Sequence, residues 1–270
     1  MEITISTGCL YKYPLEDFFH VAQQADFDGV ELLISSNNCN IPLDYIRALS
    51  KEFHMPILSL HSPFVLCKGW GGFWEKIERS FNMAVELSIP LVNFHPPTGL
   101  FPRHRLTYEL AQNLKQYSRM SEKSDIIITI ENLPTVTKLR KFYVNRLFPR
   151  LSNNMYQILD FAENNNINIT FDTTHVGTTG INLIDAYLFF KNRISNIHIS
   201  DYADGIQHML PGKGKLPLKT FLSRISNDGY KGLLTLETSP DSMEHENKEQ
   251  AIQNAAESLD FIRKALKNHT

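Results

Sequence analysis

Short apolar runs alternate with longer segments of helical period along the whole chain. The runs are rich in Ile, Val, Leu and Phe, and their brevity and apolar character are typical of strands buried on both faces of a parallel sheet. The eight predicted strands cover residues 3–6, 29–33, 57–60, 91–94, 126–130, 167–171, 194–199 and 233–236.

The segments between these runs predict amphipathic helices. The first carries Phe18, Phe19 and Ala22 at helical spacing, so one face of the helix can cover a sheet. Asn182 and Pro14 stand where such helices are expected to begin. Eight strand-then-helix units in 270 residues average about 34 residues each, which is close to the repeat of a (β/α)8 barrel, the α/β fold known as the TIM barrel. An open, doubly wound sheet is the alternative, and no linker divides residues 1–270, so one domain is expected.

Composition narrows the class of protein. The chain is 42% hydrophobic and carries 27 Lys plus Arg against 29 Asp plus Glu, so it can bury a core, and it lacks the basic excess typical of proteins that bind nucleic acid by charge alone. Its three cysteines show no CxxC spacing, which favours free thiols. The sequence shows no signal peptide and no apolar run of membrane-spanning length, so we expect a cytoplasmic protein without membrane contact.

The segment 133–151, after the fifth strand, is the longest departure from the repeat. It contains no acidic residue, and its basic residues are Lys138, Arg140, Lys141, Arg146 and Arg150. Loops that follow strands lie on the active face of a barrel, so this segment predicts a basic substrate loop in which Arg140 contacts the substrate. A solvated insertion is the alternative.

Polar side chains that can bind metal recur at or just beyond the ends of the predicted strands. All strands of a parallel barrel run the same way, so these residues converge on one mouth however far apart they lie in the sequence. The seven positions, one for each strand from the second to the eighth, are Glu31, His61, His95, Glu131, Asp172, His198 and Glu237. The sequence therefore predicts three imidazoles and four carboxylates at the carboxyl end of the barrel.

Such a cluster predicts a bound divalent cation. A single His after a strand is more often hydrogen-bonded locally than a metal ligand, but several carboxylates at one mouth repel each other and are unfavourable to desolvate. A cation removes that repulsion, and mixed imidazole and carboxylate donors suit Zn²⁺, Mn²⁺, Co²⁺ or Fe²⁺ better than Ca²⁺ or Mg²⁺. His175, three residues after Asp172, is either a further donor or a loop-capping residue.

Two loop segments supply further candidates for substrate contact. Gly212 and Gly214 flank Lys213, whose ammonium group could neutralise a phosphate or carboxylate, although a simple turn into a helix explains the glycines equally well. Trp70 follows the third strand and could form an apolar wall or lid over the site. The alternative is that this aromatic segment anchors the next helix against the barrel.

The strand ends resemble those of the xylose-isomerase-like TIM barrels, a superfamily of sugar and sugar-phosphate isomerases and epimerases that also includes endonuclease IV. The resemblance covers nearly the whole chain and rests on residues 27–32, 60–64, 93–96, 130–134, 171–175, 198–201, 211–214 and 236–237.

The isomerase and epimerase members imply a four-ligand metal site made of Glu131, Asp172, His198 and Glu237. In that branch Glu131 and Glu237 are also the acid and base on either side of the substrate, and the metal binds neighbouring ketose oxygens and stabilises the enediolate. His175 would then contact a substrate oxygen. The resemblance implies no nucleotide cofactor.

Endonuclease IV implies a different use of overlapping positions. There a three-zinc cluster supplies a hydroxide that attacks the phosphodiester at an abasic site. The corresponding ligands here are His61, His95, Glu131, Asp172, His175, His198, His208 and Glu237. Ile206 stands where that branch has a ligand Asp, and Asp204 is out of register. Lys213 stands where many isomerase-like members carry Glu, which suits an anionic substrate such as a sugar phosphate.

The sequence thus predicts a barrel that binds Mn²⁺, Co²⁺, Mg²⁺ or Zn²⁺ and isomerises or epimerises a sugar or sugar phosphate. One alternative is a zinc phosphodiesterase acting at abasic sites, the only interpretation in which nucleic acid is a partner. The other is a non-catalytic sugar-binding barrel, against which the presence of both Glu131 and Glu237 argues. Exposed aromatic faces could form a homodimer, and the sequence does not decide this.

Overall fold

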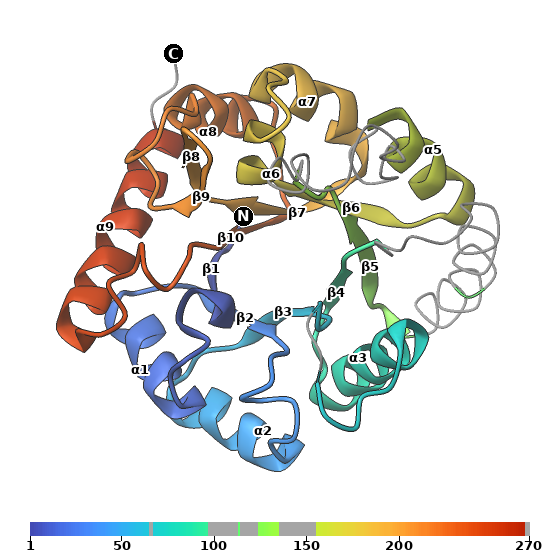
Figure 1. The fold of residues 1–270 in the computed structure, drawn as a ribbon, viewed down its shortest axis with the longest axis vertical. Coiled ribbons are helices and arrows are strands. Elements are labelled where there is room, and N and C mark those ends of the chain that lie inside the picture. The colour runs from blue at the N-terminus through green and yellow to red at the C-terminus, as the bar shows by residue number, and fades with distance from the viewer. Residues whose placement is uncertain (65–66, 97–112, 114–123, 135–154, 268–270) are drawn as a thin grey trace, which may run out of the picture.

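All eight predicted strands are present and form one closed parallel barrel (Figure 1). The computed structural model describes residues 1–64, 67–96, 113, 124–134 and 155–267. The barrel strands are β1 (Ile3–Ser6), β2 (Gly29–Leu33), β3 (Ile57–His61), β4 (Leu91–Phe94), β5 (Ile127–Glu131), β6 (Asn168–Asp172), β7 (Ile194–Ile199) and β10 (Leu233–Leu236). Three of them end one residue later than predicted, so His61, Glu131 and Asp172 are the last residues of their strands.

The strands follow the order β1-β10-β7-β6-β5-β4-β3-β2, and each pair of neighbours is parallel. The barrel closes where β1 pairs with β10 through partners such as Thr4 and Thr235. Closure confirms the (β/α)8 prediction and excludes the open-sheet alternative. It also brings all the strand ends to one mouth.

Helices surround the barrel, with the apolar faces that the sequence predicts (Figure 1). They are α1 (Leu15–Gln24), α2 (Leu43–Glu52), α3 (Phe73–Leu87), α5 (Met155–Asn165), α6 (Thr173–Gly177), α7 (Leu183–Phe190), α8 (Leu218–Asn227) and α9 (Lys248–Lys267), with short 3-10 turns η1 (Thr7–Leu10) and η4 (Lys191–Arg193). Asn182 caps α7, because its side-chain oxygen accepts hydrogen bonds from the amides of Ile184 and Asp185. Within the described residues, no helix has the length and apolarity that crossing a membrane requires.

A small antiparallel hairpin, which the sequence analysis did not predict, follows β7. It consists of β8 (Asp201–Ala203) and β9 (Ile206–Met209), joined by Asp204 and Gly205. Both turn residues have positive φ, 51° and 87°, as a two-residue hairpin turn requires. The hairpin carries His208 back toward the mouth of the barrel.

The interior of the barrel is polar. Hydrogen bonds join side chains on strands that are not neighbours, such as Asn196 on β7 and Glu31 on β2, so they run through the interior. The residues concerned are fully buried: Thr4, Ser6, Glu31, Ser59, His61, Asn93, Thr129, Glu131, Thr170, Asp172, Asn196, His198 and Thr235. The alternate residues of the same strands are apolar and belong to the core shared with the helices.

The strands are buried on both faces, as predicted, but only the face toward the helices is apolar. Strands such as Ile3–Ser6 alternate apolar and polar residues with period two, and this alternation separates the helix-facing side from the interior. The inward side chains are satisfied by one another: Thr129 Oγ1 lies 2.8 Å from Thr170 Oγ1, and Thr4 Oγ1 lies 2.9 Å from Thr235 Oγ1. A hydrogen-bonded network fills the space below the mouth.

Candidate metal centre

The predicted ligands meet at the carboxyl end of the barrel. Their donor atoms fall into three groups, and within each group all atoms lie within 4.8 Å of one another. The groups are Glu131, Asp172, His198 and Glu237; His61, His95 and Glu131; and Asp172, His175 and His208. Glu131 belongs to two groups and Asp172 to two, so the three groups form one continuous cluster.

The central group combines one imidazole and three carboxylates from β5, β6, β7 and the residue after β10. His198 Nδ1 lies 2.9 Å from Glu237 Oε2 and 3.5 Å from Glu131 Oε2. Two ligands of a tetrahedral zinc ion, each about 2.0–2.2 Å from the metal, are about 3.3–3.5 Å apart. These separations are close to what a shared ion requires.

Buried atoms without hydrogen bonds support the fit of a cation to this group. Among the described residues, Glu131 Oε1, Asp172 Oδ2 and His198 Nδ1 are buried and make no hydrogen bond. A buried polar atom without a partner is destabilising, whereas a cation coordinated at this point would satisfy all three. The donor set therefore fits a divalent metal.

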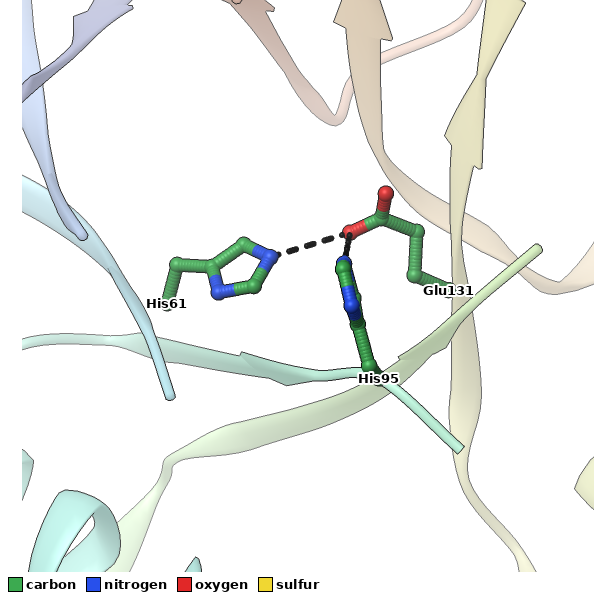
Figure 2. A group of neighbouring side chains, drawn as sticks. All are labelled: His61, His95 and Glu131. Carbon is green, nitrogen blue, oxygen red and sulfur yellow. Dashed lines mark hydrogen bonds and ion pairs between the residues drawn. The ribbon is translucent and has the colours of Figure 1, made fainter. Parts of the chain in front are cut away.

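His61 and His95 flank Glu131 on one side of the central group (Figure 2). Their Nε2 atoms lie 3.2 Å and 3.6 Å from the same carboxylate oxygen, Glu131 Oε2. Asn93 donates a hydrogen bond to that oxygen as well, at 2.5 Å. His61 Nδ1 lies 2.7 Å from the carbonyl oxygen of Ser62, so this nitrogen carries a proton. Burial lowers the pKa of His61, but its contact with Glu131 raises the pKa above the usual value.

His175 and His208 flank Asp172 on the other side. His175 Nδ1 lies 2.8 Å from the carbonyl oxygen of Asn132 and 3.7 Å from Asp172 Oδ2. The side chain of Asn132 fixes Asp172, because it accepts a hydrogen bond from the Asp172 amide at 2.8 Å and donates one to the Asp172 carbonyl at 3.1 Å. His208, at the end of the hairpin, has Nδ1 3.1 Å from the carbonyl oxygen of Glu237.

Contacts between the imidazoles and the carboxylates shift the pKa values of both. Burial would raise the pKa of Glu131, but attraction to His198 and His95 holds the pKa well below its usual range. Burial likewise opposes ionisation of Glu237, and His198 lowers its pKa. Conversely, burial lowers the pKa of His175, but the charges of Asp172 and Glu131 raise it to about 9. Protons on the histidines thus neutralise carboxylates that a metal would bind.

The metal-free protein is therefore expected to lose stability as the pH rises above neutrality. The folded-state pKa of His175 exceeds its unfolded value of about 6.5, so its contribution is complete below about pH 6.5 and is lost as the pH rises through about 9. Thermal unfolding in chelator between about pH 6 and pH 10 tests this, since the midpoint of wild type should fall more steeply than that of His175→Asn. Parallel curves would contradict the assignment.

The structure places two predicted residues, Glu31 and Trp70, outside the three donor groups. Glu31 is not at the end of β2: it is fully buried in the barrel interior and belongs to none of the three groups. Trp70 is 5% exposed, and its indole donates a hydrogen bond to the carbonyl oxygen of Cys39, so it packs in the core. Lys213 lies exposed in the loop before α8. Arg140 and nearly all of the segment 133–151 lie outside the described residues.

The structure adds residues that the sequence analysis did not single out. Asn93 and Asn132 orient Glu131 and Asp172. Phe64 is 54% exposed and stacks on His95 with 5.0 Å between ring centroids, so an exposed aromatic ring borders the His61, His95 and Glu131 group. Their positions in the sequence could have indicated this. Asn93 is the next-to-last residue of β4, and Asn132 directly follows the last residue of β5.

Asp201 fixes the loop that holds Lys213. Its carboxylate accepts hydrogen bonds from the amides of Tyr202, Gly212 and Leu216 at 2.8, 3.0 and 3.0 Å. A Cβ atom at Gly214 would clash with the Asp201 carboxylate and lie 2.8 Å from the Tyr202 amide nitrogen. The loop therefore needs glycine at position 214.

Gly214→Ala should destabilise the protein by about 1–3 kcal/mol, because the added methyl group overpacks a site fixed by three hydrogen bonds. The expected fall in melting temperature is about 3–10 °C. Gly72→Ala is the control, since its Cβ would meet only the carboxyl group of the exposed Glu75, and it should change stability by less than about 1 kcal/mol. Equal melting temperatures for the two variants would contradict the role of Gly214.

The fold and site define a (β/α)8 barrel with a mixed histidine and carboxylate centre at its carboxyl end. A family model described as "Xylose isomerase-like TIM barrel" matches residues 19–265, and the chain belongs to that family.

Named relatives include both uncharacterized proteins and sugar epimerases. The chain is 25% identical over 282 residues to an uncharacterized protein of Mycobacterium tuberculosis, covering 98% of each. It is 21% identical over 245 residues to a fructoselysine 3-epimerase of Escherichia coli O157:H7, covering 84% of this chain and 86% of the relative.

Solved structures share the fold. A D-allulose 3-epimerase from Methylomonas sp. superposes with a TM-score of 0.75 at 15% identity, covering 98% of each chain. The IOLI protein, solved with a zinc atom, superposes with a TM-score of 0.75 at 18% identity, covering 99% of this chain and 100% of the other.

Proposed function

We propose that the protein is a metal-dependent epimerase or isomerase that moves a proton at a carbon next to the carbonyl group of a ketose. The observation that carries this proposal is that two carboxylates, Glu131 and Glu237, both lie within 3.5 Å of His198 Nδ1 in one four-donor group. They come from β5 and from the end of β10, strands that are not neighbours in the barrel. Two carboxylates facing one site can serve the two faces of one carbon.

In this proposal one carboxylate removes the proton and the other returns one to the opposite face. Both are ionised in the metal-free protein, since the pKa of each is lowered by His198 against the effect of burial, so either can act as the base. A divalent cation held by Glu131, Asp172, His198 and Glu237 would supply Lewis-acid polarisation of the carbonyl oxygen. The exposed ring of Phe64 would cover the apolar face of the sugar and limit water access.

The named epimerases among the relatives support a ketose as the substrate class. We further propose that the substrate carries an anionic group such as a phosphate, because Lys213 and the basic residues near Arg140 suit a negative charge. Cytoplasmic location stays an expectation from the sequence.

Deuterium exchange tests the proposed reaction directly. The zinc- or manganese-loaded protein is incubated in D₂O with D-fructose, D-tagatose, D-allulose and phosphorylated counterparts, and the proton spectrum is followed. Exchange at one carbon next to the carbonyl, with formation of the epimer or isomer, supports the proposal. Sugar binding by calorimetry with no exchange at any carbon would instead support a non-catalytic barrel.

The two flanking groups favour a second candidate, a phosphodiesterase with more than one metal ion. His61 and His95 share Glu131 with the central group, and His175 and His208 share Asp172. The missing carboxylate weakens this candidate: Ile206 is 59% exposed, and Asp204 pairs with Lys215 at 2.8 Å. Two or three zinc ions per chain, with incision of abasic-site DNA that is lost in His95→Ala, would support it over the epimerase.

A further inference from the structure

A fourth buried carboxylate, Glu31, lies against the metal centre but outside its donor groups. It is fully buried on β2. Its Oε2 atom lies 3.1 Å from His198 Nε2 and accepts hydrogen bonds from Ser59 Oγ at 2.9 Å and from Asn196 Nδ2 at 3.4 Å. Neither the proton transfer nor the donor set described above uses Glu31.

The contact with Glu31 determines which nitrogen of His198 carries the proton. Glu31 Oε2 accepts hydrogen bonds from Ser59 and Asn196, so it faces His198 as an acceptor as well, and Nε2 carries the proton that it donates. In a neutral ring the other nitrogen, Nδ1, is then unprotonated. Nδ1 is the atom that faces Glu237 and Glu131 and that makes no hydrogen bond among the described residues.

We propose that Glu31 is a positioning residue of the metal centre, which holds His198 in the Nε2-protonated form and turns the lone pair of Nδ1 toward the ion. The inference rests on the metal site of the proposed function. A carboxylate behind a ligating histidine fixes the ring and raises its basicity, and loss of such a partner weakens metal binding by about 10–100-fold. The carboxylate of Glu31 is itself held by side chains on β3 and β7.

The alternative is that Glu31 only completes the hydrogen-bond network of the interior. Ser59→Ala separates the two, because it removes a hydrogen bond to the same oxygen, Glu31 Oε2, and leaves the contact with His198 in place. If Glu31 acts through His198, Glu31→Gln weakens zinc binding and Ser59→Ala does not.

The experiment measures zinc affinity without any substrate, by competition with a chelating dye. We expect Glu31→Gln to bind zinc about 10–100-fold more weakly than wild type and Ser59→Ala to stay within about threefold. Unfolding of the metal-free variants checks that both are folded. Equal affinity of folded Glu31→Gln and wild type, equal losses in the two variants, or a wild type that binds no zinc would overturn the proposal.

A second measurement uses the wild-type protein alone, in case Glu31→Gln does not fold. Nitrogen-15 spectra of zinc-loaded protein with labelled histidines report which ring nitrogen is protonated. The signals of His198 are identified as those that are missing from the spectrum of His198→Gln. Protonated Nε2 and metal-bound Nδ1 are expected, and the reverse would overturn the proposal. Neither measurement involves turnover, so the two proposals can fail separately. If zinc binding depends on Glu31 but no ketose is epimerised, the proposed function is refuted and this inference still holds.

Discussion

Glu131→Gln should reduce proton exchange on the substrate by about 10²–10⁴-fold, the range that one general acid or base contributes. Glutamine keeps the shape of the side chain but neither accepts the substrate proton nor carries the charge that faces four imidazoles. His61, His95 and His198 have nitrogens 3.2, 3.6 and 3.5 Å from Glu131 Oε2, and His175 Nδ1 lies 3.2 Å from Oε1. The substitution should therefore also weaken metal binding at both groups that share Glu131.

Exchange in D₂O and the metal content per chain measure the two effects separately. Glu163→Gln is the matched control, because Glu163 is exposed on α5 and belongs to none of the three groups, and it should behave as wild type. A Glu131→Gln protein that binds metal normally but exchanges no proton would assign the residue to proton transfer alone. Retention of more than about a tenth of the wild-type exchange rate would contradict a catalytic role.

Removal of the metal should lower the melting temperature by about 8–16 °C. A ligand at about a thousand times its dissociation constant stabilises the folded state by about 4 kcal/mol, and each kcal/mol changes the melting temperature of a domain of this size by about 2–4 °C. The physical source is the close grouping of Glu131, Asp172 and Glu237: burial raises the pKa of Asp172, and the carboxylates raise the pKa of His198 against the effect of burial, so their ionisation is balanced by protons when no metal is present.

Thermal unfolding with and without chelator, and after zinc or manganese is added back, measures this shift. The same series on His198→Gln should show a much smaller difference, because that variant lacks the only imidazole of the central group. A wild-type melting temperature that does not respond to chelator or to added metal would refute a metal centre at this position.

The sequence predicts the barrel and the four central candidate metal ligands because both depend on the repeating pattern of strands and helices along the chain. Eight short strands, each followed by a helix, leave the residues at the strand ends at one mouth, whatever their separation. Glu131, Asp172, His198 and Glu237 could be identified in this way, and the structure groups all four. The extension of three strands by one residue does not change which side chains reach the site.

The remaining parts depend on contacts between single residues far apart in the sequence. The sequence predicts Glu31 at the mouth because it stands near the end of a strand, but Glu31 is the middle residue of β2. Its partner His198 is 167 positions away in the sequence, so no local pattern indicates this contact. Trp70 was expected over the site, whereas its indole is held by a backbone carbonyl 31 positions earlier. The hairpin that carries His208 depends on a two-residue turn at Asp204 and Gly205, which the strand-then-helix pattern does not include.

The polar interior of the barrel also restricts how each strand can be aligned. Side chains alternate between the two faces of a strand, so a slip of one residue would turn Ile130 and Phe171 into the interior and move Glu131 and Asp172 out among the helices. Such a slip would break interior pairs such as Thr129 with Thr170. Each strand therefore has a single permitted alignment, and the residues that hold the strands in that alignment sit directly beneath the metal ligands. A substitution that shifts a strand would therefore also displace the side chains of the candidate metal centre.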